Sequence, residues 1–111
     1  MRQTIGEFEE IVLLVVAAQH DNAYGLSVTL AIEEQLKRTV KLSSVHTSLY
    51  RLEEKGLVES RIGDTSTERG GRKKRHFIIT ELGKQTLIAS QEARQLLWQQ
   101  IPKTVLDLGK S

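Results

Sequence analysis

Apolar residues recur with a helical period in the first part of the chain. Over residues 5–19 they fall at the spacing of one helix face, at Phe8, Ile11, Val12, Val15 and Val16. This spacing predicts an amphipathic first helix. The sequence Thr4-Ile5-Gly6-Glu7 has the form of a capping box, so Thr4 is expected to cap that helix. His20-Asp21-Asn22 then predicts a turn.

Two further helices are predicted before the middle of the chain. The second runs from Tyr24-Gly25 to about Lys37, because apolar residues repeat at four-residue spacing at Val28, Ile32 and Leu36. Residues 39–41 favour a short strand. The third helix is expected to have Ser43 or Ser44 as its N-cap and to end at Gly56, which suits the left-handed residue after a helix.

The pattern then changes to a period of two. Strands are predicted over about residues 57–65 and 72–80, because Phe77 and Ile79 alternate with their neighbours as on a strand with one packed face. Thr80 is a suitable N-cap for a last helix over about 81–101. That helix carries apolar residues at Leu82, Ala89, Ala93, Leu96, Leu97, Trp98 and Ile101.

Three helices followed by a hairpin predict a winged helix-turn-helix, a mainly α fold with a small β-hairpin (α+β). The hairpin is the wing, residues 1–80 form the winged-helix domain, and residues 81–111 form a C-terminal dimerisation helix and tail. Folding of the last helix back onto its own core is the simpler arrangement. We favour a homodimer, because so many apolar residues in a small domain call for a partner surface and this motif commonly binds paired half-sites.

Composition excludes several classes of protein. The 111-residue chain has no cysteine, so disulfides, thiolate metal sites and thiol catalysis are ruled out. Its apolar run over residues 11–18 is too short for a membrane span and lacks the features of a signal peptide. We therefore expect a cytoplasmic protein of one domain. No cofactor is expected, and the three scattered histidines suggest neither an enzyme nor a metal sensor.

The positive charge is concentrated in residues 69–75, which hold five of the 16 basic residues of the chain. Outside this stretch 11 basic residues face 14 acidic ones, so the net charge of +2 arises there. A turn rich in cations indicates contact with a polyanion, and duplex DNA is the leading candidate. The alternative is a solvated charge run that keeps an edge strand soluble, but the two glycines within it favour close approach of the backbone to a ligand.

The third helix offers a second polar surface. At about 100° per residue, Val45, Leu49 and Leu52 share one side, which is the expected core side. The polar residues Ser43, Thr47, Tyr50 and Glu54 point away from it, with His46 and Arg51 on the flanks. Any solvated helix has such a face, but the basic turn on the same chain favours DNA contact. Glu53 and Glu54 are expected to repel phosphates, so we expect the N-terminal half of the helix to enter the groove.

Several motifs in this order resemble the PadR family of bacterial transcriptional regulators. They are Gly6-Glu7-Phe8-Glu9, Ala23-Tyr24-Gly25, the segment from Leu49 to Val58, the wing from Glu68 to Arg75, and Thr80-Glu81-Leu82-Gly83. The resemblance covers residues 4–100 and implies a homodimer that binds a roughly palindromic double-stranded DNA operator, usually as a repressor. It implies contacts from the third helix in the major groove, at Ser44, His46, Thr47, Tyr50 and Arg51. It implies further contacts from the wing on the backbone or minor groove, at Arg69, Gly71, Arg72, Lys73, Lys74 and Arg75.

Two features of the resemblance concern the end of the chain and the first turn of the third helix. His46 stands where many relatives have tyrosine, and the short last helix is typical of the compact branch of the family. Some compact members bind flat aromatic ligands between their subunits, against a tryptophan of the last helix. Trp98 is the candidate for that effector site, with Leu97 and Ile101 beside it; its other interpretation is an anchor of the dimer interface.

A winged helix can also bind RNA, or a protein partner inside a larger complex. That function predicts weak DNA binding without sequence preference, and a last helix that pairs with a foreign chain. The residues alone favour a dimeric, sequence-specific DNA-binding regulator.

Overall fold

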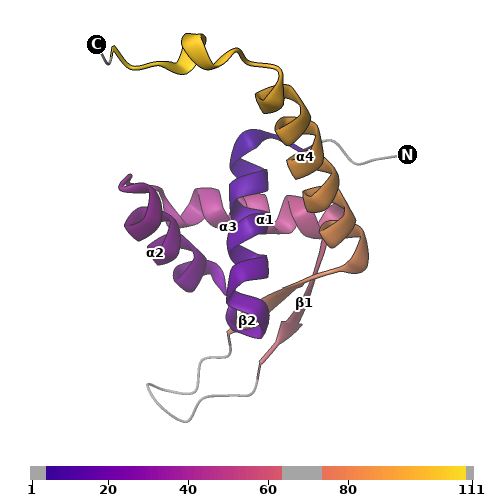
Figure 1. Cartoon of the computed structure of the whole chain (residues 1–111). Coiled ribbons are helices and arrows are strands. Elements are labelled where there is room, and N and C mark those ends of the chain that lie inside the picture. Colours follow the sequence, from indigo (N-terminus) through magenta and orange to yellow (C-terminus); the bar gives the residue numbers. More distant parts are fainter. Residues whose placement is uncertain (1–4, 64–73, 110–111) are drawn as a thin grey trace.

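The computed structural model describes residues 5–63 and 74–109 (Figure 1). Its elements, in order along the chain, are α1 (Glu7–Gln19), η1 (His20–Asn22), α2 (Gly25–Leu36), α3 (Leu42–Glu54), β1 (Val58–Ile62), β2 (Arg75–Ile79), α4 (Glu81–Gln99) and η3 (Lys103–Leu106). The predicted α+β class, three helices and a hairpin followed by a fourth helix, is confirmed. No helix in these two ranges is long and apolar enough to cross a membrane.

The core lies where the first three helices meet the hairpin. It consists of apolar side chains with almost no solvent exposure: Val12, Leu13, Val16, Ala23, Val28, Ile32, Val45, Leu49, Leu52, Leu57, Val58 and Phe77. The predicted inward stripe of α1 is confirmed, because its other members pack against this cluster. Leu36 departs from the prediction: it is the last residue of α2 and is exposed. Lys37, which follows it, is left-handed, with a φ of 55°, and ends the helix there.

The hairpin is a two-stranded antiparallel sheet in which Val58 pairs with Ile79 and Ile62 with Arg75. Ala23 adds an isolated bridge to this sheet, since its carbonyl accepts a hydrogen bond of 2.8 Å from the amide of Phe77. The prediction of a short strand at residues 39–41 is wrong, because these residues form neither a strand nor a helix. Val40 instead packs against the core. Because Ala23 lies between α1 and α2, its bridge to Phe77 makes that segment an extension of the sheet, which apolar periodicity did not indicate.

Two predicted helix starts are corrected. α1 begins at Glu7 with Gly6 as its N-cap and no side-chain cap; Thr4 lies outside the described residues. α3 begins at Leu42, and its N-cap is Lys41 rather than Ser43 or Ser44. Ser43 and Ser44 therefore do not act as N-caps and lie within the first turn of the helix.

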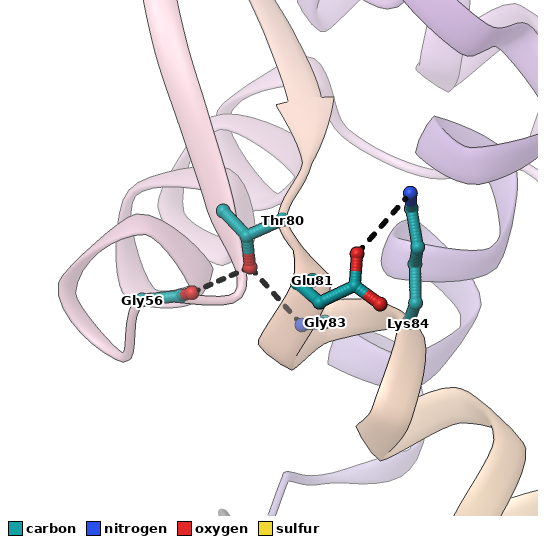
Figure 2. Close-up of polar contacts among 5 residues, drawn as sticks. All are labelled: Gly56, Thr80, Glu81, Gly83 and Lys84. Carbon is teal, nitrogen blue, oxygen red and sulfur yellow. Dashed lines mark hydrogen bonds and ion pairs between the residues drawn. The ribbon is translucent and has the colours of Figure 1, made fainter.

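The two predicted boundaries on either side of the hairpin are confirmed. Gly56, just after α3, has a positive φ of 79°. Thr80 caps α4, since its hydroxyl oxygen accepts a hydrogen bond of 3.0 Å from the amide of Gly83. The same hydroxyl donates to the carbonyl of Gly56 over 2.7 Å, which ties the start of α4 to the end of α3 (Figure 2). An exposed ion pair of 3.6 Å between Glu81 and Lys84 lies beside this junction.

The last elements project from the three-helix body. In Figure 1 the segment after α4 runs away from the other helices, and the hairpin lies at the opposite end of the molecule. The radius of gyration is 17.1 Å, whereas a compact domain of this length has about 13 Å. The chain is thus extended by α4 and its tail on one side and by the hairpin on the other.

Candidate nucleic-acid interface

α3 has the two sides that the sequence predicts. Val45, Leu49 and Leu52 are fully buried, and Ser48 joins them on the core side. The exposed residues of the helix after Leu42 are Ser43, Ser44, Thr47, Tyr50, Arg51 and Glu54, and His46 is half-buried. α3 therefore presents one continuous polar surface to the solvent while its other side holds the core together.

One flank of that surface faces the start of α1. Ser44, Thr47 and Arg51 line a shallow depression of about 400 Å³ whose other wall includes Phe8 and Glu9. The hydroxyl of Thr47 donates to the carbonyl of Ser43, 3.0 Å away, so the lone pairs and the methyl group of Thr47 remain for an external partner. Within the described ranges the guanidinium of Arg51 has no ion pair. This flank offers short polar groups and one available cation.

The other flank of that surface packs against α2 and the hairpin through aromatic rings. His46 stacks on Tyr50 with ring centroids 6.1 Å apart, and Tyr50 meets the edge of Phe77 at the same separation. The His46 ring also packs against Gly25, where an added Cβ would lie 2.6 Å from its Nε2. Its Nδ1 is buried without a hydrogen-bond partner in the described structure. His46 is thus packed against Gly25 on one side, and its ring supports the ring of Tyr50.

The base of the hairpin brings two of the predicted wing cations next to α2 and α3. The ammonium of Lys74 lies 4.3 Å from the ring centre of Tyr24, a cation–π contact. Tyr24 also meets His76 edge to face, with centroids 5.6 Å apart. Arg75 donates from Nη1 to the hydroxyl of Ser60 over 2.9 Å. The remaining predicted wing residues, Arg69, Gly71, Arg72 and Lys73, lie outside the described residues.

Glu53 has a different place from the one that the sequence suggested. We expected both Glu53 and Glu54 to face phosphates and repel them. Glu54 is exposed, but Glu53 is half-buried and accepts a hydrogen bond of 2.6 Å from the hydroxyl of Ser60. One of the two carboxylates is therefore bound within the protein.

A second surface lies on α4, far from the hairpin. A groove of about 520 Å³ between α1 and α4 is lined by Leu14, Leu87, Ile88 and Trp98 together with polar side chains. Leu97 and Trp98 are about 60% exposed, at 63% and 59%, and Ile101 is half-buried. Glu10 holds the polar part of the groove together. Its carboxylate accepts a hydrogen bond of 2.9 Å from the hydroxyl of Ser90 and lies 3.7 Å from the guanidinium of Arg94. Such large apolar exposure is typical of a contact surface.

The sequence did not reveal the residues that support these surfaces. The pattern of the sequence places Tyr24 and Gly25 at the start of a helix, but no apolar period marks these two residues or Ser60 as supports of α3. The positions of Gly25 opposite His46 and of Ser60 opposite Glu53 follow from how α2 and the hairpin pack on α3. Across the described ranges, no three histidine, aspartate or glutamate side chains gather so as to hold a metal ion.

Comparison with known proteins gives a family for this fold and surface. Residues 12–89 match the sequence model of the transcriptional regulator PadR-like family, a family of transcription regulators and not of enzymes. Among curated protein sequences none matches significantly.

Solved structures resemble the whole arrangement at low sequence identity. A PadR-like transcription factor from Bacteroides fragilis superposes with a TM-score of 0.72 at 18% identity, over 83% of this chain and 84% of its own. A PadR-like transcriptional regulator from Bacillus cereus superposes with 0.71 at 18%, over 89% and 91%. RosR of H. salinarum superposes with 0.69 at 20%, over 90% and 83%. These similarities establish the fold.

Proposed function

Because the chain belongs to the PadR-like family of transcriptional regulators, we propose that it is a homodimeric, sequence-specific DNA-binding repressor. In this proposal α3 enters the major groove, and the hairpin lies on the backbone or in the minor groove. Residues 1–80 bind the operator, and residues 81–111 join two copies. Each copy then binds one half of a roughly palindromic double-stranded site.

The polar face of α3 beside the base of the hairpin carries this proposal. Its 13 residues form a rod of about 20 Å, and the major groove admits a helix of that kind. The core residues of α3 point the other way, so the polar face is the side that can approach DNA. Lys74 and Tyr24 stand next to this face, where a phosphate flanking the groove would meet them.

The groups on that face suit distinct contacts. Thr47 has already used its hydroxyl proton on Ser43, so it accepts from an amino group of adenine or cytosine or packs its methyl against thymine. Arg51 is available for phosphate or for a bidentate contact with guanine. Ser43, Ser44 and Tyr50 complete the surface, and His46 supports Tyr50. Lys74 supplies a phosphate contact that carries no base information.

The apolar face of α4 supports the dimer. A dimer that covers Leu97, Trp98 and the groove of Leu14 and Ile88 removes large apolar side chains from water. Tryptophan is common at the centre of such interfaces, so we assign Trp98 as an interface anchor. The same exposed ring is the place where a flat aromatic effector stacks if the protein has one.

Binding to DNA selected by the protein itself from a random pool tests the proposal. We expect the wild-type protein to bind the selected duplex at least 10³-fold more tightly than a scrambled duplex at physiological salt. Thr47→Ala and Arg51→Ala should each lose about 1–3 kcal/mol of discrimination. Lys74→Ala should weaken both duplexes alike and lower the salt slope by about one. Equal affinity for both duplexes would instead support a module that binds RNA or another protein.

A further inference from the structure

A chain of three polar side chains connects the end of α3 to both strands of the hairpin. The guanidinium of Arg75 in β2 donates to the hydroxyl of Ser60 in β1 over 2.9 Å. That hydroxyl donates in turn to the carboxylate of Glu53 in α3 over 2.6 Å. Glu53 and Ser60 are half-buried, and Arg75 is exposed. The three residues therefore link the helix and the hairpin by side chains alone.

The strand register explains why they meet. Ser60 pairs with Phe77, and Arg75 pairs with Ile62. Alternation along each strand puts Ser60 and Arg75 on the same face as Phe77, one diagonal step apart. Phe77 is fully buried and meets Tyr50 of α3, so this face is the one that packs on α3. Arg75 thus extends along the inner face of the hairpin, whereas Arg61 and His76 belong to the outer face.

The chemistry of the link favours a fixed geometry. A carboxylate in the last turn of a helix lies at the negative end of the helix dipole, which is an unfavourable position. Two donors offset this: the serine hydroxyl bonds Glu53 directly, and the guanidinium polarises that hydroxyl. Hydrogen bonds that involve ionised groups are stronger than neutral ones, and bonds in a chain reinforce each other.

From this geometry we propose that Glu53 and Arg75 are positioning residues, which clamp the hairpin to α3 through Ser60. The clamp sets the spacing between the two elements that contact DNA, and it uses the charge of Arg75 for this purpose instead of for a phosphate. The inference rests on the proposed function, because the spacing matters only if both elements bind one duplex. It gives an acidic residue next to a polyanion a role that favours binding.

The sign of the effect of Glu53 on DNA affinity tests the clamp. Removal of a carboxylate near phosphates should strengthen DNA binding if electrostatics alone decides. The clamp predicts the opposite: Glu53→Ala weakens binding to the selected duplex by about tenfold, which corresponds to a loss of roughly 1.4 kcal/mol of binding free energy. Glu54→Ala is the matched control, because Glu54 is the next residue of the same helix and is exposed. Its removal should leave affinity unchanged or raise it.

Glu53→Gln retains an oxygen that accepts from Ser60 and should restore most of the affinity. If Glu53 acted only through its charge, Glu53→Gln and Glu53→Ala would raise DNA affinity by the same factor. Ser60→Ala should resemble Glu53→Ala, and Ser60→Thr, which keeps the hydroxyl, should stay closer to the wild type. Unfolding midpoints are measured for every variant, and affinities are compared at a temperature where all are folded. If Glu53→Ala does not fold, the Ser60 pair decides the question.

A double-mutant cycle separates the clamp from an independent phosphate contact of Arg75. We expect Arg75→Ala and Glu53→Ala to weaken binding alike, and the double variant to be no weaker than either one within about twofold. Arg61→Ala, on the outer face of the hairpin, is the matched control for loss of one cation. Additive effects, or tighter binding by Glu53→Ala, would overturn the clamp while leaving the repressor proposal intact. Equal affinity of the wild-type protein for the selected and the scrambled duplex would instead overturn the repressor proposal.

Discussion

Replacement of Gly83 by alanine is expected to destabilise the protein although it adds a good helix former. Gly83 is buried in the first turn of α4, and its amide donates to Thr80 over 3.0 Å. A Cβ at this position would lie 2.7 Å from Cγ1 of Ile79 and would overlap the carbonyl oxygen of Leu57. The obstacle is thus largely backbone, which cannot turn away as a side chain can.

The magnitude follows from one stabilising contribution and two destabilising ones. Alanine in place of glycine stabilises a helix by about 0.5–1 kcal/mol. Overpacking against a fixed neighbour costs about 1–3 kcal/mol, and we take the upper half of that range because the neighbour is backbone. A displaced α4 also weakens the bond to Thr80, worth about 1 kcal/mol. The expected net loss is about 2–3.5 kcal/mol in the free energy of unfolding.

Urea unfolding at matched protein concentration measures this loss. With a slope of about 1–3 kcal/mol per molar urea, the midpoint should fall by roughly 1–2 M. Gln85→Ala is the control, because Gln85 is exposed in the same turn and its replacement should stay within about 0.5 kcal/mol. A Gly83→Ala variant as stable as the wild type would refute the claim that α4 begins in direct contact with the turn after α3.

Two other expectations concern the interfaces of the molecule. Gly25→Ala should lower both stability and DNA affinity, since its Cβ would lie 2.6 Å from Nε2 of His46; the double variant with His46→Ala should regain stability, and unfolding curves of the two variants would show whether it does. Trp98→Ala should raise the dimer dissociation constant by at least about 30-fold, equivalent to roughly 2 kcal/mol. Sedimentation at several concentrations measures this, with the exposed Gln99→Ala as control, and an unchanged dimer would remove Trp98 from the interface.

The sequence allowed the helices, the core side of α3 and the start of α4 to be predicted, because each depends on local signals. Apolar spacing marked Val45, Leu49 and Leu52, and each of them is fully buried. Thr80 was recognised as an N-cap because a hydroxyl at that position bonds an amide three residues later. The family resemblance followed from several such local motifs in order.

The start of α3 and the supports of the site were not predictable in the same way. Ser43 and Ser44 look like N-caps, but Leu42 already lies in the helix, and the amides of Ser44 and Val45 donate to the carbonyl of Lys41. The bond between Glu53 and Ser60 depends on how the hairpin lies against α3. No pattern within either segment encodes the distance between two segments, so the role of Glu53 became visible only in three dimensions.

The charges of α3 show how affinity and discrimination are divided in the proposed complex. α3 carries one basic residue, Arg51, and two acidic ones, so the helix as a whole does not attract phosphates. Lys55, just beyond its end, is bound to Glu9 of α1 at 2.7 Å. Attraction to DNA in the proposed complex therefore comes mainly from basic residues outside the helix, above all those of the hairpin, and α3 contributes mainly short polar groups. It follows that the salt dependence of binding should depend on the hairpin and sequence preference on α3, so changes in one should leave the other nearly unaltered.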